Sequence, residues 1–339
     1  MQNKGIVFTA PCVTELLDVP MPELKPGYAL VKVVSSAISS GTERANLVGD
    51  TSLSVDSKAA ELPTYPRRKG YSTSGVVEAV GEGVEGLKAG DRVAMCWTTH
   101  SRWVCIPEKN IIKISDGVGF GEASLLHIAA FPMAAIRKCR LEIGESAIVM
   151  GQGILGQLAV TLLRAAGAAP IIACDPVAAK RKRALELGAD YALDPLEPDF
   201  AEKAKELTGG GAHVAIEVTG VGAGLNGALD CMRRFGRVAL LGCTRSADFT
   251  VDYYRKVHGP GITLVGAHTH ARPVDESHPG YWTTRDDMQT MDRLLACGRL
   301  DWSGVVEEVH SPVDAPEVFN RLITEKGFPI VRFDWSLLD

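Results

Sequence analysis

The sequence predicts an α/β protein in two parts, a β-rich unit followed by a doubly wound parallel-sheet unit. Two observations support this prediction. Up to about residue 118, short β-branched runs alternate with Gly and Pro turns, and from about residue 120 apolar strands alternate with helices. The chain also has 339 residues, which is more than one hydrophobic core usually supports. Two domains are therefore expected.

The β-rich unit is expected to form from short strands joined by tight turns. Turn sequences lie at residues 81–83 and 88–91. Regular alternation of short strands and turns is typical of a compact all-β domain. The predicted strands cover residues 5–8, 28–34, 75–80, 92–94, 102–106 and 111–114.

The second unit is expected to begin with a helix over residues 121–138 that is kinked at Pro132. The strands that follow are apolar throughout, which is typical of a parallel sheet covered by helices on both faces. These strands are predicted at residues 146–150, 170–174, 191–193, 214–217, 237–241 and 262–265, with helices at 155–166, 176–187, 199–208 and 225–231.

The C-terminal tail is expected to return to the β-rich unit. It mixes predicted helices at residues 286–297 and 315–323 with predicted strands at 305–309 and 330–333. The predicted domains are therefore residues 1–120 completed by 275–339, and residues 121–274.

Composition and charge exclude several classes of function. The net charge of −5 leaves no basic excess for nucleic acid. The longest apolar stretch, residues 125–136, is too short to span a bilayer, so no membrane partner is expected. The eight cysteines form no C-x-x-C pair, and no secretory leader is visible. A cytoplasmic protein with reduced thiols is expected.

A glycine-rich loop at residues 149–156 gives the strongest chemical signal. It follows a predicted strand and opens a predicted helix, as dinucleotide-binding loops do. Gly151 permits the tight turn, Gly153 leaves room for a pyrophosphate, and Gly156 lets the helix pack closely. The N–H groups at the helix start, around Ile154 and Leu155, are then available to the phosphates. A purely structural glycine turn is the alternative.

Asp175 ends the next predicted strand, and it bears on the choice of cofactor. A carboxylate there accepts hydrogen bonds from the adenosine ribose and repels a 2′-phosphate, so NAD is expected rather than NADP. Lys180 lies about one helical turn further on, within reach of the same ribose. Arg181 and Arg183 argue the other way, because an arginine can hold the extra phosphate. Acceptance of NADP therefore stays open.

Several further segments resemble one known family. They are residues 27–33, 70–81, 88–93, 141–145, 187–190, 217–220 and 236–242. With the glycine loop, they make the chain similar over essentially its whole length to the medium-chain dehydrogenase/reductase superfamily of zinc alcohol and polyol dehydrogenases. The resemblance implies a GroES-like β-rich catalytic domain, a Rossmann NAD-binding domain, an active site in the cleft between them, and a homodimer or homotetramer. It also implies that the nicotinamide lies along Val218, Thr219, Gly242, Cys243, Ala267 and Thr269.

The sequence departs from this family at the zinc ligands. Ser40 stands where zinc members carry a cysteine, and Tyr71 stands where they carry a histidine. His127 falls at the third ligand position. Serine and tyrosine hydroxyls are poor substitutes for thiolate and imidazole on Zn²⁺. The lobe with four closely spaced cysteines is also missing, so neither a catalytic nor a structural zinc is expected.

Without zinc, another group must move the alcohol proton. His127 is a candidate because histidine titrates near neutral pH, and Tyr71 because a phenol can donate to a developing oxyanion. By resemblance, Thr42 matches the hydroxyl that relays the proton. The alternatives are a core histidine at position 127, a packing role for Tyr71, a turn hydroxyl at Thr42 and a structural ion pair at Glu43.

Two clusters are candidates for contact with a small-molecule substrate. Residues 96–100 include Trp97 and His100, and residues 266–273 include His268 and His270; Ser40 is a further candidate. Aromatic rings with polar donors suit a sugar, polyol or cyclitol-like substrate. A surface loop at a dimer contact is the alternative for residues 266–283.

The sequence therefore predicts an NAD-dependent, zinc-independent dehydrogenase that transfers a hydride between a secondary alcohol or ketone and nicotinamide. Two other enzymes remain as alternatives, an NAD(P)H-dependent reductase of an activated C=C bond and a bacteriochlorophyllide-type dehydrogenase. A catalytically silent nicotinamide-binding sensor is the alternative from another class.

Overall fold

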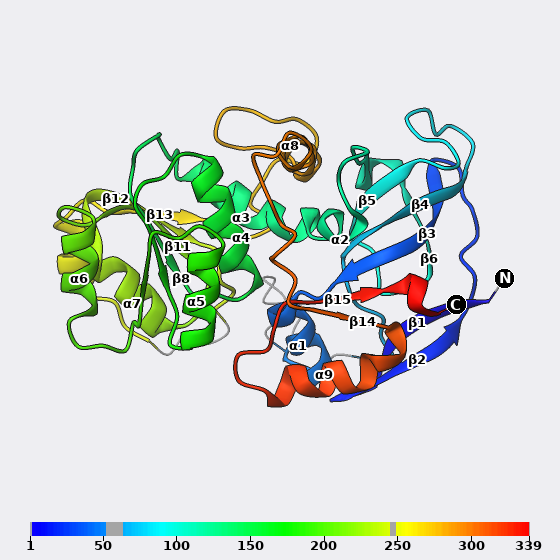
Figure 1. Ribbon diagram of the computed structural model, residues 1–339, viewed down its shortest axis with the longest axis horizontal. Coiled ribbons are helices and arrows are strands. Elements are labelled where there is room, and N and C mark those ends of the chain that lie inside the picture. The colour runs from blue at the N-terminus through cyan, green and yellow to red at the C-terminus, as the bar shows by residue number, and fades with distance from the viewer. Residues whose placement is uncertain (1, 52–63, 245–248, 339) are drawn as a thin grey trace. The chain divides into compact units, whose positions relative to one another are not determined.

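The computed structural model describes residues 2–51, 64–244 and 249–338 (Figure 1). The chain divides into two compact units. The β-rich unit comprises Met1–Ile128 and Met288–Asp339, and the parallel-sheet unit comprises Ala129–Asp287. The divisions fall inside helices α3 (Leu126–Lys138) and α8 (Thr284–Ala296), 8 and 13 residues after the expected boundaries at 120/121 and 274/275.

The β-rich unit is built on a seven-stranded sheet and a separate hairpin. Strand β3 is central to the sheet, since it pairs with β4, β6 and β15. Because β15 comes from the C-terminal tail, the last residues of the chain complete this sheet, as the sequence predicts. The strands are β3 (Tyr28–Ala37), β4 (Ser72–Val80), β5 (Arg92–Cys96), β6 (Trp103–Pro107), β7 (Ile111–Lys113), β14 (Glu308–His310) and β15 (Val331–Asp334), and the hairpin is β1 (Asn3–Ala10) with β2 (Val13–Val19).

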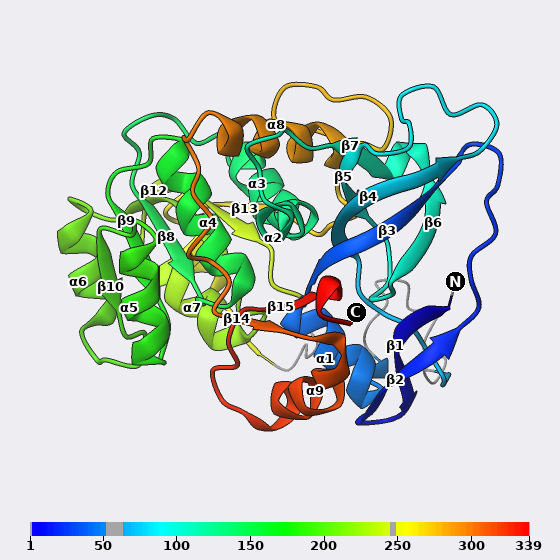
Figure 2. The same ribbon diagram turned by 45° about the vertical axis from the view of Figure 1, so that its right-hand side comes forward.

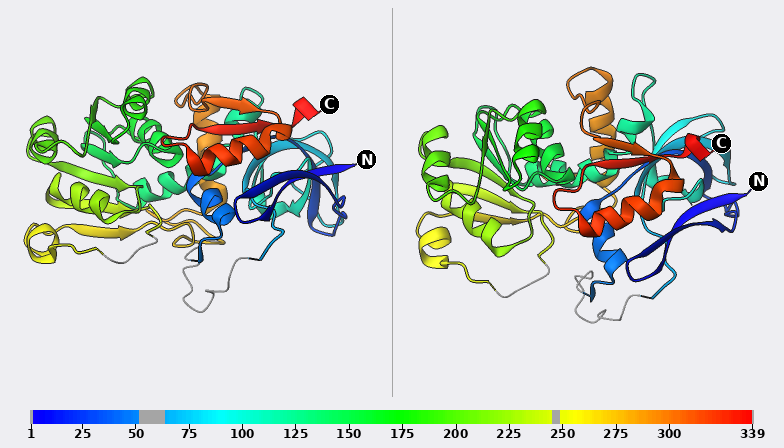
Figure 3. Two further views of the ribbon diagram at one scale, coloured as in Figure 1. Left: turned by 90° about the horizontal axis from the view of Figure 1, so that it is seen from below. Right: turned by 60° about the horizontal axis from the view of Figure 1, so that its bottom comes forward.

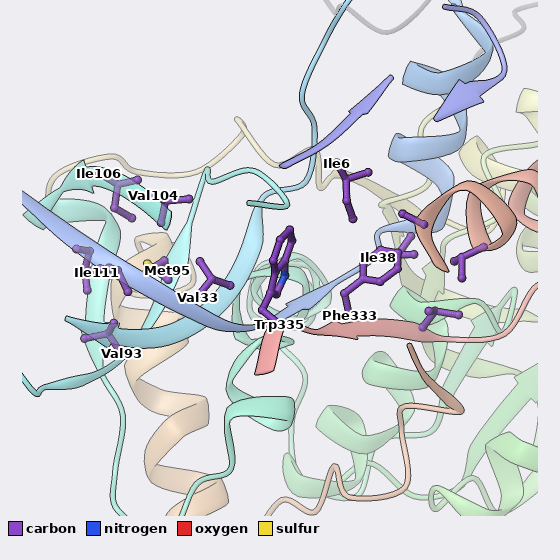
Figure 4. Close-up of a cluster of buried hydrophobic side chains, with 14 of the residues drawn as sticks. Ile6, Val33, Ile38, Val93, Met95, Val104, Ile106, Ile111, Phe333 and Trp335 are labelled. Carbon is purple, nitrogen blue, oxygen red and sulfur yellow. The ribbon is translucent and has the colours of Figure 1, made fainter. Parts of the chain in front are cut away.

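The core of this unit joins side chains from its two ends. Figure 4 shows Phe333 and Trp335 from the tail beside Val33 and Ile38 of the N-terminal part. All four side chains are buried. Burial of each large apolar side chain contributes about 1.5–3 kcal/mol, so the tail is part of the core. Helix α9 (Ala315–Thr324) packs against β2 (Figure 3).

The parallel-sheet unit has six strands in the order β10-β9-β8-β11-β12-β13, all parallel, which confirms the predicted fold class. Helices α4 and α5 pack against β8, β9 and β10, and α7 packs against β8, β11 and β12 (Figure 2). The elements are β8 (Ala147–Met150), α4 (Ile154–Ala165), β9 (Ile171–Cys174), α5 (Ala178–Glu186), β10 (Tyr191–Leu193), α6 (Phe200–Leu207), β11 (Ala212–Glu217), α7 (Gly222–Asp230), β12 (Met232–Leu240) and β13 (Thr263–Gly266), with a π-helix at Tyr254–His258.

Two local details differ from the sequence prediction. The expected helix over 121–138 is two helices, α2 (Phe120–Ala123) and α3, and Pro132 lies inside α3. The interruption is a turn at Ser124 and Leu125, where the Ser124 hydroxyl donates to the Gly121 carbonyl at 2.7 Å. Helix α1 (Ser40–Val48) was not predicted, because its apolar face is short and polar residues dominate it. Short 3-10 turns complete the chain at Glu108–Asn110, Pro312–Asp314 and Trp335–Leu338.

Candidate active site

The glycine loop follows the carboxyl end of β8, and its three glycines have different surroundings. Gly151 has φ +94°, a left-handed conformation that favours glycine. A Cβ on Gly156 would overlap the carbonyl oxygen of Gly151, so α4 and the loop are in close contact. A Cβ on Gly153 would meet no atom within 4 Å. The loop is therefore tight at both ends and open at Gly153, as a pyrophosphate approach requires.

Asp175 lies directly after β9 and is hydrogen-bonded to the glycine loop. Its Oδ2 accepts from the backbone N–H of Gln152 at 2.8 Å, and its Oδ1 accepts from that of Val177 at 2.8 Å. A carboxylate has about four lone-pair positions, so both oxygens can still accept from ribose hydroxyls. The structure thus brings Asp175 and the loop together. Lys180 lies partly exposed on α5.

The two arginines that argued for NADP each form hydrogen bonds within the protein. Nη1 of Arg181 donates to the Asp175 carbonyl at 2.7 Å and to Asp194 Oδ2 at 3.0 Å. Arg183 pairs with Glu186 at 2.9 Å on the surface of α5.

The turn after β11 is organised by a residue that sequence reasoning missed, Glu217. Its buried carboxylate accepts from the Thr219 N–H at 2.7 Å, from the Thr219 hydroxyl and from the Gly220 N–H. Burial raises the pKa of Glu217, although these hydrogen bonds lower it. The Gly242 N–H donates to the Glu217 carbonyl at 2.8 Å, so the turns after β11 and β12 are joined. Val218, Thr219 and Gly242 therefore lie together, with Cys243 exposed beside them.

The segment after β13 contains the remaining residues expected along the nicotinamide. Ala267 is buried and its N–H donates to Leu240 at 3.1 Å. Thr269 Oγ1 is buried, and no described residue gives it a hydrogen-bond partner. Such an orphaned hydroxyl is costly unless a ligand or water pairs with it. It therefore fits a polar group of a bound cofactor.

Lys138 is a second residue that the sequence did not single out. Its Nζ donates to the carbonyl of Gly266 at 2.9 Å and to that of Ala271, one at each end of this segment. Burial lowers the pKa of Lys138, and the charge of Arg272 lowers it further. His268, inside the segment, also has a lowered pKa because it is partly buried and lies near His270. Lys138 thus fixes the segment from both ends.

In the β-rich unit, Tyr71, Trp97 and His127 form an aromatic cluster. The ring of His127 lies edge-on to both others, with centroids 4.6 Å from Trp97 and 5.3 Å from Tyr71. His127 is fully buried, and its Nδ1 lies 2.7 Å from the Tyr71 carbonyl oxygen. A carbonyl only accepts, so Nδ1 carries the proton and Nε2 is the basic nitrogen of the neutral ring. The sequence-based candidates Tyr71 and His127 are therefore in contact.

The phenol of Tyr71 hydrogen-bonds to Ser39 Oγ. Ser40, which the sequence matches to the cysteine position of zinc members, is the next residue; it lies partly exposed in the first turn of α1, as does Thr42. Ser39 is the N-cap residue of α1. The Ser-Ser-Gly-Thr-Glu order at the helix start is the signal that would have identified it, since serine favours the N-cap.

Trp97, a predicted substrate contact, is partly exposed in the structure. Its side chain is 45% exposed, and its backbone has φ +59°, which costs a non-glycine residue about 1–2 kcal/mol. The Trp97 N–H donates to the carbonyl of Tyr71, the residue before β4, at 2.9 Å, and this bond stabilises the backbone conformation.

The structure corrects the prediction that His100 contacts substrate. Its side chain is buried, and both of its ring nitrogens are bonded to other side chains of the protein. Nε2 lies 2.9 Å from Glu43 Oε2 and Nδ1 lies 2.8 Å from Ser36 Oγ. Both ring nitrogens are thus bonded within the core. Glu43 forms the structural pair that the sequence offered as its alternative.

The residues at the expected zinc position do not fit that ion. The position offers the Tyr71 phenol, which donates to the Ser39 hydroxyl, the hydroxyl of Ser40, and the His127 imidazole, whose Nδ1 faces a carbonyl. Zinc in proteins prefers thiolate, imidazole and carboxylate ligands. Across residues 2–51, 64–244 and 249–338, no group of three or more His, Cys, Asp or Glu side chains is placed to hold a metal ion.

Comparison with known proteins gives the family. Residues 25–132 match the alcohol dehydrogenase GroES-like domain, and residues 155–277 match the zinc-binding dehydrogenase family. These matches cover most of the chain, which belongs to the medium-chain dehydrogenase/reductase superfamily. The predicted resemblance and the GroES-like plus Rossmann fold class are confirmed.

Three relatives illustrate the similarity. (R,R)-butanediol dehydrogenase of Bacillus subtilis is 33% identical over 229 residues, 59% of this chain and 66% of that protein. D-guloside 3-dehydrogenase of Escherichia coli is 27% identical over 216 residues, 63% of this chain and 61% of that protein. The crystal structure of 2R,3R-butanediol dehydrogenase from Bacillus subtilis has a TM-score of 0.79 at 26% identity, with 98% of this chain and 99% of that chain covered.

The helices offer no candidate for a membrane span. Among the described residues, none is both long and apolar enough to cross a bilayer.

Proposed function

We propose that the protein is an NAD-dependent, zinc-independent dehydrogenase. It transfers a hydride between a secondary alcohol of a sugar, polyol or cyclitol-like substrate and nicotinamide. The observation that carries the proposal is the hydrogen bond from the Gln152 N–H to Asp175. The Asp175 carboxylate is thereby next to the open glycine loop, where it would accept from the ribose of NAD. An oxidoreductase that acts on CH–OH groups also agrees with the named relatives, which are dehydrogenases of a diol and of a guloside.

The parallel-sheet unit would hold the cofactor. Helix α4 offers its N-terminal N–H groups to the pyrophosphate, and Asp175 with Lys180 takes the adenosine ribose. Thr219, Gly242 and the orphaned hydroxyl of Thr269 lie at carboxyl ends of neighbouring parallel strands, where ligands of such sheets bind. When bound, NAD supplies the atom that accepts the hydride.

The β-rich unit would handle the proton. His127 takes the alcohol proton at Nε2, because Nδ1–H is fixed on the Tyr71 carbonyl. Tyr71 would donate to the substrate oxygen as charge develops on it. Its single O–H donates to Ser39 Oγ in this structure, so the Ser39 hydroxyl would then turn and donate to the phenol oxygen. Thr42, in the first turn of α1, would relay the proton. The exposed ring of Trp97 would contact the C–H groups of a polyhydroxylated substrate.

A screen of NAD and NADP reduction against a panel of sugars and polyols tests this proposal. The protein is washed with a chelator, and its metal content is measured on the same sample. The expected result is reduction of NAD with a polyhydroxylated alcohol and no requirement for zinc. A stoichiometric zinc that activity requires would contradict the zinc independence. Saturable NAD binding without turnover on any alcohol or carbonyl compound would favour the alternative of a catalytically silent nicotinamide-binding sensor.

A second copy of the chain is the partner we propose. Strand β13 is the edge of the parallel sheet, and Leu264 on it is 41% exposed. Exposed apolar edge strands tend to pair with another chain. Leu264→Lys should convert a homodimer to a monomer, which light scattering measures as a halved molar mass. If the variant keeps the molar mass of the wild type, β13 is not the dimer contact.

A further inference from the structure

We propose that Glu43 and His100 are positioning residues for the Tyr71 phenol. The inference rests on the proposed role of Tyr71 and goes beyond it, because neither residue belongs to the acid–base pair. The buried pair supports both ends of the hydrogen bond between Tyr71 and Ser39.

The first support acts through Ser39. Glu43 Oε1 accepts from the Ser39 backbone N–H at 2.8 Å, while Ser39 Oγ bonds to the phenol. Glu43 Oε2 is bonded to His100 Nε2 at 2.9 Å, and both side chains are 1% exposed. Glu43 therefore fixes the residue that holds the phenol.

The second support acts through the backbone that precedes Tyr71. The His100 N–H donates to the Lys69 carbonyl at 2.9 Å. Gly70 has φ +107°, and a Cβ there would lie 2.7 Å from His100 Cδ2. The imidazole thus packs directly against the residue that leads into Tyr71. One buried pair sets the position of the phenol from both sides.

The far side of His100 is also fixed. Its Nδ1 lies 2.8 Å from Ser36 Oγ, which accepts from the indole N–H of Trp335 at 2.9 Å. With Glu43 ionised, His100 donates from Nε2 and accepts from the Ser36 hydroxyl at Nδ1. Every polar group of this network then has a partner, which is the condition under which a buried network rigidifies its surroundings.

The chemistry of this network provides a rescue variant. A glutamine at position 43 can still accept from the Ser39 N–H through its oxygen. Its NH₂ group then faces His100 Nε2, which accepts if the imidazole moves its proton to Nδ1 and donates to Ser36. A leucine at position 43 removes both contacts. Glu43→Gln should therefore preserve the position of Tyr71, and Glu43→Leu should not.

A double-mutant cycle with Tyr71→Phe tests the inference. Glu43→Leu should lower kcat by about 10²-fold, because a displacement of about 1 Å is enough for such a loss. In the Tyr71→Phe background the same change should cost less than about twofold, since the group it positions is gone. Glu43→Gln should restore most of kcat, and the Kd for NAD should be the same in every variant.

Two further variants guard against a folding artefact. Ser36→Ala is milder than Glu43→Leu and removes only the hydroxyl behind His100; it should lower kcat by about tenfold, again only when Tyr71 is present. Asp292→Leu is the matched control in the same unit. Asp292 is buried and accepts from the Ser115 N–H at 3.0 Å and from its hydroxyl at 2.7 Å. It should lower Tm and leave kcat unchanged.

Three outcomes overturn the inference. In the first, Glu43→Leu costs as much in the Tyr71→Phe background as in the wild-type background, which means that the pair acts on stability alone. In the second, Glu43→Leu leaves kcat unchanged. If Tyr71→Phe itself turns over like the wild type, the proposed role of Tyr71 fails first, and the positioning role fails with it, while NAD reduction by the wild type still stands.

Discussion

The two units of the molecule fix their functional residues in different ways. In the parallel-sheet unit, the glycine loop, Asp175 and the Glu217 turn each follow the carboxyl end of a strand, and their partners are mainly backbone N–H groups. In the β-rich unit, Ser39 and His127 reach Tyr71 from separate segments of the chain. A site set by strand ends is encoded locally, whereas a site set by side-chain contacts depends on the whole domain.

This contrast predicts that substitutions in the two units should separate two properties. Changes in the β-rich unit should lower kcat and leave cofactor affinity intact. Changes in the parallel-sheet unit should first change cofactor affinity. The predictions below test that separation, beginning with the largest effect.

The largest effect is expected for the acid–base pair. His127→Ala and Tyr71→Phe should each lower kcat/KM by about 10²–10⁴-fold, because general acid–base catalysis contributes that much. Isothermal titration should give the wild-type Kd for NAD in both variants. If both variants keep near wild-type turnover with cofactor binding intact, another group must transfer the alcohol proton.

The next largest effect is expected for cofactor choice at Asp175. Asp175→Asn removes the negative charge that repels a 2′-phosphate and weakens the acceptors for the ribose hydroxyls. Hydrogen bonds to a charged group contribute about 1.5–3 kcal/mol, so the Kd for NAD should rise by about 10–100-fold. The preference for NAD over NADP should fall as well. A variant that keeps the wild-type preference would show that Asp175 lies away from the ribose.

Two glycines of the same loop form a matched pair. A Cβ on Gly153 would enter open space, and a Cβ on Gly156 would overlap the Gly151 carbonyl. Gly153→Ala should leave Tm unchanged and raise the Kd for NAD by about tenfold, since only the pyrophosphate approach is obstructed. Gly156→Ala should lower the free energy of unfolding by about 1–3 kcal/mol through overpacking. Equal loss of Tm in both would contradict an open loop at Gly153.

The contrast also explains how much the sequence could predict. The glycine loop and Asp175 carried their structural context with them, a strand before and a helix after, so their contact followed from local order. Lys138 was missed because its two carbonyl partners, at Gly266 and Ala271, lie more than a hundred residues away in sequence. Its identity as a lysine at a helix end gave no sign of burial.

In the β-rich unit, the types of residue were predictable and their roles were only partly so. Tyr71 and His127 were found through their positions relative to a zinc site. His100 was assigned to substrate because histidine beside tryptophan suggested a polar surface, but its nitrogens bond to Ser36 and Glu43. Only tertiary packing decides whether such a side chain faces solvent or the core, and no local pattern records it.

The smallest effect is expected for the pH dependence of stability at Glu217. Burial raises its folded-state pKa above the unfolded value, so the native protein binds a proton more readily than the unfolded chain there. Stability should therefore fall as pH rises from the unfolded pKa, about 4.5, through the raised folded pKa. Glu217→Gln keeps an oxygen for the Thr219 and Gly220 N–H groups and removes the titration. The variant should lose less Tm than the wild type between pH 5 and pH 8, by about 2 °C if the titration contributes about 1 kcal/mol. Identical Tm–pH curves would mean that the carboxylate is ionised at no cost, and that the backbone N–H groups of this turn compensate fully for its burial.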